Sequence, residues 1–192
     1  MIIYATKQTI ERYKIVLPQD MHSPIREMAL ITLQKESGDR LLEWGAKLFY
    51  FDRRKCLQVV NFASKLTLFL FNVKIDDLSA VGNAIAQYLL DIYSNNAVMT
   101  KLLKRFFDDY PVVMFDRLTD RRAIATLNHT QLTFADDGYR FFDFIENNIL
   151  QTRKINMKVN FDWIFSEKNA GKTDYFYSGE RFEQLLKERY LS

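Results

Sequence analysis

The segment WGAKLFYFDRRKCLQVVNFASKLTLFLFNVK, residues 44–74, decides the fold of this chain. Two short apolar runs, at residues 48–51 and 57–60, flank a polar segment at residues 52–55 whose length suits a hairpin loop. A third run, at residues 66–73, is apolar at odd and even positions alike, which predicts a strand covered on both faces. The segment therefore predicts a small antiparallel sheet.

Helical patterns lie on both sides of this segment. Before it, a strand over residues 2–5 precedes a helix over residues 7–13 that Thr6 can cap, and Pro24 suits the first position of a helix that ends near residue 36. After it, we expect helices at residues 78–92 with Asp76 as N-cap, at 98–107, from a cap at Thr119 or Asp120 to residue 134, at 139–145 and at 179–190, and extended pieces at residues 112–115, 158–165 and 173–177. This order favours the α+β class, with a small antiparallel sheet packed against several amphipathic helices.

Length and composition indicate one globular domain over residues 1–192. The chain is 48% apolar and 15% aromatic, unlike a disordered chain. Its 27 Lys and Arg residues are interspersed with 24 Asp and Glu residues, which gives little support to nucleic-acid binding. The single cysteine, Cys56, excludes an internal disulfide and a cysteine-based zinc site. The chain shows no secretory signal and no apolar run near the ~20 residues of a membrane span, so we expect a cytoplasmic protein with no membrane contact, metal or cofactor.

Several short motifs resemble those of an uncharacterised bacterial family. They are Ala5-Thr6-Lys7, the acidic–Trp pair Glu43-Trp44, Arg53-Arg54-Lys55, Val59-Val60-Asn61, and the Arg-to-Asn helix segment DRRAIATLN at residues 120–128. This sequence departs from the pattern at Gly45, where an aromatic residue is more usual, and no Asn precedes Arg121. The resemblance implies a family-like core at residues 1–137 and a C-terminal extension at residues 138–192 packed on it. It also implies a bacterial, cytoplasmic domain of unknown function, frequent on mobile elements, and it brings no catalytic residue.

Two basic clusters are the candidate nucleic-acid-binding residues. Arg53-Arg54-Lys55 falls at the predicted hairpin turn, where cations on a rigid loop can contact phosphates. The other interpretation is a solvated turn that guards the strand ends. Arg121-Arg122 falls in the first turn of its helix, where cations oppose the helix dipole, a placement more frequent at functional sites. Asp116 and Asp120 are close enough in sequence to pair with both of these arginines.

His129 follows Arg122 by seven positions, which places both side chains on one face of the predicted helix. The pair is loosely similar to the Arg/His site of helical nucleases that cleave RNA as dimers. This resemblance implies His129 as acid or base and Arg122 as the group that stabilises the charged phosphorane. Those nucleases are all-helical, whereas this chain has a β-rich centre, and an exposed surface histidine is the alternative interpretation.

Aromatic residues near cations, in Tyr175-Phe176-Tyr177 and in Phe141-Phe142 with Phe144, are typical of protein interfaces and of surfaces that stack bases. The sequence therefore favours a non-enzymatic protein-interaction module that binds another protein or itself. The family resemblance implies that such a module is encoded on a mobile element. The alternative is a nucleic-acid-binding or RNA-cleaving protein that uses the two basic clusters and His129.

Overall fold

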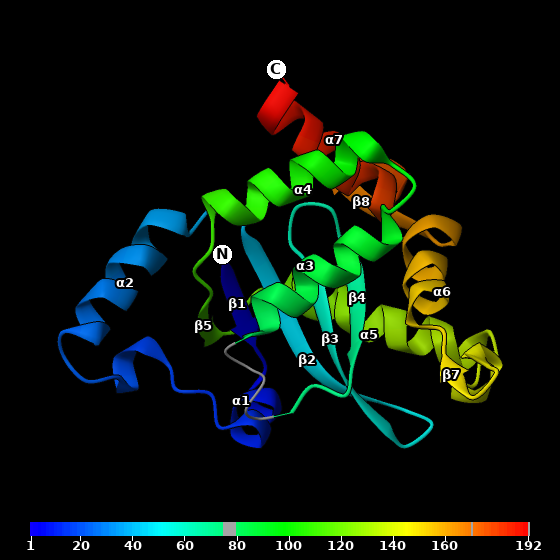
Figure 1. Ribbon diagram of the computed structural model, residues 1–192, viewed down its shortest axis with the longest axis horizontal. Helices are drawn as coiled ribbons and strands as arrows, with labels where there is room; N and C mark the ends of the chain where they lie inside the picture. The colour runs from blue at the N-terminus through cyan, green and yellow to red at the C-terminus, as the bar shows by residue number, and fades with distance from the viewer. Residues whose placement is uncertain (75–79, 170, 192) are drawn as a thin grey trace.

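The computed structural model describes residues 1–74, 80–169 and 171–191 (Figure 1). In chain order its elements are β1 (Ile2–Ala5), α1 (Lys7–Tyr13), the 3-10 helix η1 (Pro18–Asp20), α2 (Ile25–Glu36), β2 (Glu43–Phe51), β3 (Arg54–Asn61), β4 (Thr67–Phe71), α3 (Val81–Ile92), α4 (Ala97–Asp109), β5 (Met114–Arg117), α5 (Arg121–Asp136), the 3-10 helix η3 (Phe141–Phe144), β6 (Ile145–Glu146), β7 (Ile149–Leu150), α6 (Thr152–Met157), the π-helical turn η4 (Lys158–Asp162), β8 (Ile164–Asn169), β9 (Lys172–Tyr177) and α7 (Ser178–Leu191). These elements confirm the α+β class.

The main sheet has five strands in the order β4-β3-β2-β1-β5. β2, β3 and β4 form an antiparallel meander, which confirms the sheet predicted at residues 44–74. β1 lies between β2 and β5 and is parallel to both, with Ile3 opposite Trp44 on one side and Phe115 on the other. The complete sheet is therefore mixed, because two strands from outside the central segment extend it.

Alternate side chains of the meander point to opposite faces of the sheet, and both faces are buried. One face contributes Trp44, Leu57 and Leu68 to a large apolar core shared with α3, α4 and α7. On the opposite face, Phe51 and Phe69 pack under α5 and the segment that follows it. Figure 1 shows these layers, with α3 and α4 in front of the strands and α5 behind them. The prediction of a strand covered on both faces is confirmed.

The loop between β2 and β3 is shorter than predicted. Only Asp52 and Arg53 form it, with φ angles of 43° and 67°, the left-handed pair typical of a type I′ turn. Arg54 and Lys55 already belong to β3, where they pair with the end of β2. Because side chains alternate along a strand, Arg54 and Lys55 point to opposite faces of the sheet.

Buried asparagines close the outer edge of β4. Asn156 accepts a hydrogen bond from the Phe69 N–H at 2.8 Å, and Asn160 accepts one from the Thr67 N–H at 2.8 Å. Each amide nitrogen donates back to the carbonyl of the same strand residue. Two side chains one helical turn apart therefore replace the backbone of a further strand, which satisfies polar groups that burial would otherwise leave unpaired.

Several predicted boundaries differ from the structure. The extended piece predicted at residues 158–165 is wrong as far as residue 162, because α6 continues into η4. The helix predicted at residues 139–145 is reduced to the short η3. Pro24 precedes α2 as its N-cap and is not its first residue. Asp120 caps α5 as predicted, by accepting a first-turn N–H at 2.8 Å, while the predicted cap Asp76 lies outside the described residues.

The C-terminal part of the chain contributes to both cores. Phe144 and Ile155 pack under the sheet with the residues of α5, and Phe182 and Leu186 pack on the other face. The Phe182 ring meets Trp44 edge-on, with ring centroids 6.0 Å apart. The division into a family-like core and an extension stays a prediction.

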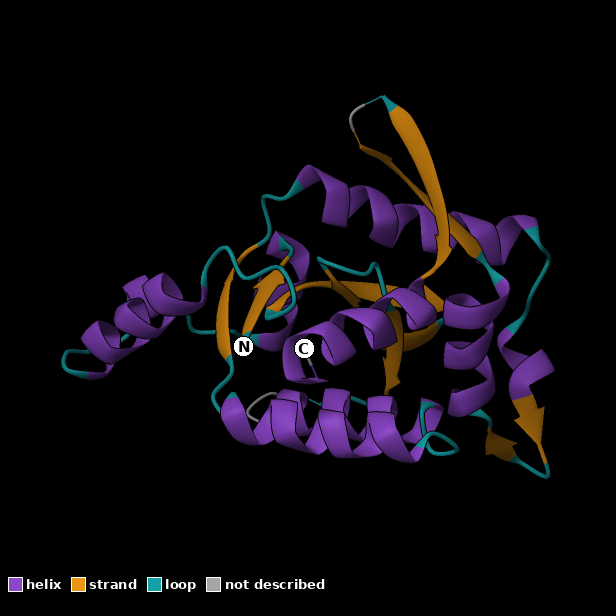
Figure 2. Cartoon of the chain, turned by 90° about the horizontal axis from the view of Figure 1, so that it is seen from above, coloured by secondary structure: helices purple, strands orange, loops and turns teal. Residues whose placement is uncertain are grey.

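Two elements stand away from this body: α2 and the hairpin formed by β8 and β9 (Figure 2). The hairpin is a separate two-stranded sheet. No helix in the described ranges is long and apolar enough to cross a bilayer.

Candidate functional site

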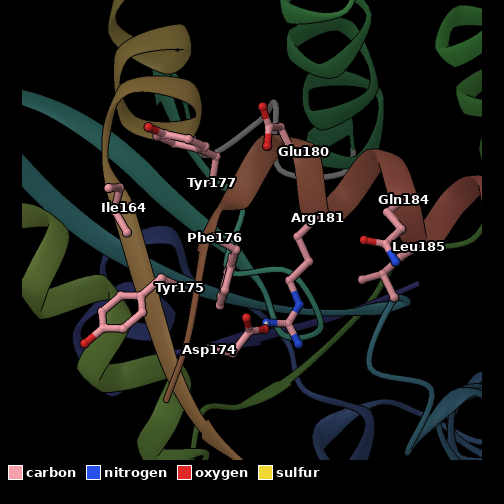
Figure 3. Close-up of a pocket in the computed structure, with 9 residues that line it drawn as sticks. All are labelled: Ile164, Asp174, Tyr175, Phe176, Tyr177, Glu180, Arg181, Gln184 and Leu185. Atoms are coloured by element: carbon pink, nitrogen blue, oxygen red, sulfur yellow. Dashed lines mark ion pairs between the residues drawn. The ribbon is translucent and has the colours of Figure 1, made fainter. Parts of the chain in front are cut away.

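The projecting hairpin and α7 form a groove of about 570 Å³ (Figure 3). Gly171 takes part in the turn of the hairpin with a φ of +82°, a backbone conformation that favours glycine. α7 begins at Ser178, directly after the last residue of β9, so the helix and the hairpin meet at a corner. The groove is lined by Ile164, Asp174, Tyr175, Phe176, Tyr177, Glu180, Arg181, Gln184 and Leu185.

The hairpin presents one apolar face to the body and another to solvent. Phe165 lies opposite Phe176, with ring centroids 6.5 Å apart, and both pack against the core under α5. The neighbouring residues Ile164 and Tyr175 remain 59% and 70% exposed. Large apolar side chains that stay exposed on an ordered element are typical of contact surfaces.

Arg181 of α7 holds the hairpin in place. Its guanidinium lies 4.2 Å from the centroid of the Phe176 ring and forms ion pairs with Glu167 at 3.2 Å and Asp174 at 3.5 Å. Figure 3 shows Arg181 reaching from α7 toward Asp174. Because the arginine is only 23% exposed and meets a carboxylate from each strand, these pairs are screened less than ordinary surface pairs. The groove is therefore preorganised.

The other polar groups along the groove are acidic or neutral. Glu180 lies in the first turn of α7, where the helix dipole stabilises negative charge. Its carboxylate forms no ion pair within the described part of the chain. Gln184 donates from its amide to Glu188 at 2.8 Å. The groove thus combines apolar surface with one unneutralised carboxylate.

The predicted cluster Arg53-Arg54-Lys55 lines a second hollow, of about 750 Å³, at the end of the β2–β3 hairpin. The Arg54 guanidinium lies 6.0 Å from the Phe141 ring centroid, and the Lys55 ammonium lies 5.4 Å from the Tyr13 ring centroid. The rest of the described lining consists of Phe71, Asn72, Val73, Lys74, Ile145, Asn148 and Leu150. This hollow combines positive charge with apolar walls.

The predicted pair Arg122 and His129 lines a smaller hollow of about 270 Å³ together with Lys65. The structure therefore brings this pair to one face, whereas Arg121 is not part of the described lining. Arg122 is 73% exposed and forms an ion pair with Glu167 at 3.7 Å. Burial is the main cause that lowers the pKa of Lys65. Glu167 acts in the opposite direction, while Arg181 and Arg122 lower that pKa further.

The two basic clusters lie at opposite ends of α5. Near its first residue, Ala123 lies beside Gly45 at the start of β2, and near its last residue the Phe134 ring contacts Phe51 at the end of β2. Its 16 residues span about 24 Å at a rise of ~1.5 Å per residue. Arg121-Arg122 occupies the first turn, and the β2–β3 turn with Arg53 lies beside the last turn, so the clusters do not form one patch.

The expected pairing of Asp116 and Asp120 with the helix arginines is wrong. Asp120 instead binds Arg40 at 2.8 Å. Burial raises the pKa of Asp120, but hydrogen bonds from the Ala123 N–H and from Arg40 outweigh it and hold the pKa below its usual value. Asp116 accepts a hydrogen bond from the Arg117 N–H at 2.7 Å.

Part of the groove is predicted from the sequence, and the rest is not. The aromatic run Tyr175-Phe176-Tyr177 lines it, as its composition suggests. Ile164 was not predicted, although its alternation with Phe165 in a strand is a usable signal. Arg181 gives no local signal, because its partners come from two strands that only the fold brings near α7.

The second aromatic cluster is mostly part of the core. Phe141 and Phe144 are buried, and only Phe142 is exposed, at 69%. The Phe51 ring contacts both buried rings, so Phe141 and Phe144 contribute to core packing and not to a contact surface.

The described residues offer no evident metal site. Within residues 1–74, 80–169 and 171–191, no three His, Cys, Asp or Glu side chains are grouped to hold a metal ion. Cys56 is buried, and burial raises the pKa of its thiol, so the reactive thiolate is disfavoured.

The chain matches a known protein family. It matches, over residues 2–181, the model of the family described as "Domain of unknown function (DUF6933)". The chain belongs to this family. The match includes both basic clusters and most of the groove, and it extends beyond the first 137 residues, where the sequence motifs lie. No curated protein and no solved structure matches the chain.

Proposed function

We propose that this DUF6933 protein is a non-enzymatic protein-interaction module that binds an extended segment of another protein in the groove between the β8–β9 hairpin and α7. The exposure of Ile164 and Tyr175, at 59% and 70%, on an element that Arg181 fixes to the body carries this proposal. A preorganised surface loses little conformational freedom on binding, so contacts made there contribute more to affinity.

The lining of the groove sets the chemistry of the partner segment. Ile164 and Tyr175, on the solvent face of the hairpin, suit an apolar side chain. Glu180 suits a lysine or arginine beside it, because its carboxylate has no cation of its own among the described residues. The proposed ligand is therefore a short peptide segment with an apolar anchor and an adjacent cation.

A displayed library of random peptides, selected against the folded protein, tests this proposal. We expect the selected peptides to share an apolar residue next to Lys or Arg. Tyr175→Ala should weaken such a peptide at least ~10-fold, as for other buried aromatic contacts at interfaces. Glu180→Arg should also weaken peptide binding, and the loss of affinity should be larger for peptides that contain more basic residues.

Phe142→Ala is the matched control, because it removes an exposed aromatic ring that lies outside the groove. It should leave peptide affinity unchanged. If the selected peptides bind the Tyr175→Ala and Glu180→Arg variants as tightly as they bind the unchanged protein, the groove is not the binding site.

A second candidate function is nucleic-acid binding at the hollow lined by Arg53-Arg54-Lys55. The observation that favours it is the grouping of these cations with Lys74 around apolar walls. Binding of single-stranded RNA should weaken steeply with salt. Each lost phosphate contact should lower the slope of log affinity against log salt concentration by ~0.7. Arg53→Ala and Arg54→Ala should each lower this slope, while Arg121→Ala, at the other end of α5, should leave it unchanged. Equal slopes in all variants would refute this site.

The RNA-cleaving form of this alternative assigns chemistry to Arg122 and His129. It predicts that His129→Ala abolishes cleavage while the protein stays folded, and cleavage that survives this change would refute it. The bacterial, cytoplasmic and mobile-element setting also stays a prediction.

A further inference from the structure

α2 leaves large apolar side chains uncovered. Only Ala29 of this helix is buried, while Ile25, Met28 and Ile31 are 63%, 68% and 65% exposed. Figures 1 and 2 show the helix standing away from the body. A helix of this length is marginal alone in water, because most helical stability comes from packing of an apolar face. A helix with this much uncovered apolar surface indicates an interface.

The outward face of α2 carries a stripe of acid, apolar residue and base. Glu27, Ile31 and Lys35 follow one another at intervals of four residues, which aligns them along the helix. Ala29 lies roughly 200° around the helix from Ile31, on the side of the body. Glu36, near that side, binds the amine of Met1.

Glu27 and Lys35 form no ion pair with other described residues. Both are exposed at opposite ends of the stripe. They lie eight positions apart, or about 12 Å at ~1.5 Å per residue, too far to pair with each other. A partner of α2 is therefore expected to bring a cation to one end of the stripe and an anion to the other.

We propose that this partner is a second copy of the chain, docked through α2 in an antiparallel pair whose two-fold axis passes beside Ile31. In this arrangement Ile31 meets its own copy, and Glu27 lies opposite Lys35 of the second copy at both ends. A parallel pair would instead place Glu27 beside its own copy and Lys35 beside its own copy. The stripe is thus self-complementary in the antiparallel sense that a closed two-fold interface requires.

The interface is small. Met28 lies beside Ile31 and extends the apolar contact, but a pair of short helices buries less than the ~1,200 Å² of a standard stable interface. The dimer is therefore weak and forms at high protein concentration. Analytical ultracentrifugation across a concentration series should show a shift from monomer to dimer.

Thiol cross-linking tests the register. Cys56 is buried, so Ile31→Cys introduces an accessible thiol that lies opposite its own copy in the pair. Under mild oxidation this variant should form a disulfide-linked dimer. Arg26→Cys is the matched control, since its copies would be about 15 Å apart along the axis, beyond the ~7 Å that a disulfide spans between Cα atoms. Equal cross-linking of the two variants would overturn the proposal.

Charge exchange tests the pairing. Glu27→Lys places like charges together at both ends, and it should weaken self-association about 10-fold. The double variant Glu27→Lys with Lys35→Glu restores both pairs, and it should recover the original dissociation constant. A monomer at every concentration, or self-association that survives Ile31→Glu, would overturn the proposal. A double variant that self-associates no more tightly than Glu27→Lys would also overturn it.

Discussion

Replacing Asn160 should cost a large part of the stability of this protein. The side chain is fully buried and takes part in four hydrogen bonds: from the Thr67 N–H at 2.8 Å, to the Thr67 carbonyl at 2.7 Å, to the Asn156 carbonyl at 2.7 Å, and from the Ser178 hydroxyl at 2.8 Å. Asn160→Ala leaves the Thr67 N–H, the Thr67 carbonyl and the Ser178 hydroxyl without these partners. At about 1–2 kcal/mol for each buried orphan group, the expected loss is roughly 3–6 kcal/mol.

Urea unfolding followed by tryptophan fluorescence measures this loss. The midpoint should fall while the slope of the free energy against urea stays the same, because the native surface changes little. Asn83→Ala is the matched control, since Asn83 is exposed on α3, and it should change stability by less than ~0.5 kcal/mol. A loss below ~1 kcal/mol for Asn160→Ala would refute the role assigned to the buried amides.

Asn160→Asp sharpens the same test through pH. The ionised carboxyl would still accept from Thr67 and Ser178, but it would face two carbonyl oxygens. Only its protonated form can donate to either of them, so burial should raise the pKa of this carboxyl above its unfolded value. The folded state then binds more protons than the unfolded state, and the stability of the variant should fall as pH rises through the folded pKa. A pH-independent deficit relative to the unchanged protein would contradict this reasoning.

Three further predictions concern single sites elsewhere in the fold. Gly179→Ala should destabilise by about 1–3 kcal/mol, because the added methyl would lie 2.4 Å from the Phe161 ring; thermal unfolding should show less extra loss when Phe161→Ala is combined with it. Asp120→Ala should remove ~1 kcal/mol of stability at neutral pH through the lost helix cap, and the difference from the unchanged protein should shrink as pH falls through the lowered pKa of Asp120; a constant difference would contradict the assignment. Cys56 should resist alkylation at pH 8 in the native protein and react once the chain is unfolded, which mass spectrometry can follow; rapid native labelling would disagree with its burial.

The parts of the fold predicted from sequence depend on local periodicity. The meander and the helices that cover it carry apolar patterns at strand or helix spacing, and both were predicted. The pairing of β1 with β5 was not predicted. It joins Ile2 to Met114, and a local sequence pattern does not indicate a contact between residues so far apart in the chain. The same limit applies to the site, where Arg181 finds its partners in two other elements.

The error at residues 158–165 has a different cause. Val159, Phe161 and Trp163 alternate with polar residues, which is a strand pattern. The helical pattern that prevails comes from earlier residues, since Ile155 and Val159 share one face and enter the core together. The sequence is compatible with a strand and with a helix, and burial of Ile155 and Val159 in the core favours the helix. Residues 158–165 alone show only the strand pattern, because Ile155 lies before them.

The position of β1 in the sheet affects how the chain folds as it leaves the ribosome. Of the five strands of the main sheet, β1 is synthesised first, yet it is an interior strand, and its second neighbour is β5, the last strand of that sheet to appear. The meander can assemble early from near neighbours, but β1 keeps one edge unpaired until residues 114–117 have emerged. Contacts of such long range slow folding and leave strand edges exposed meanwhile. Nascent chains shorter than this are therefore expected to be the species most dependent on chaperones.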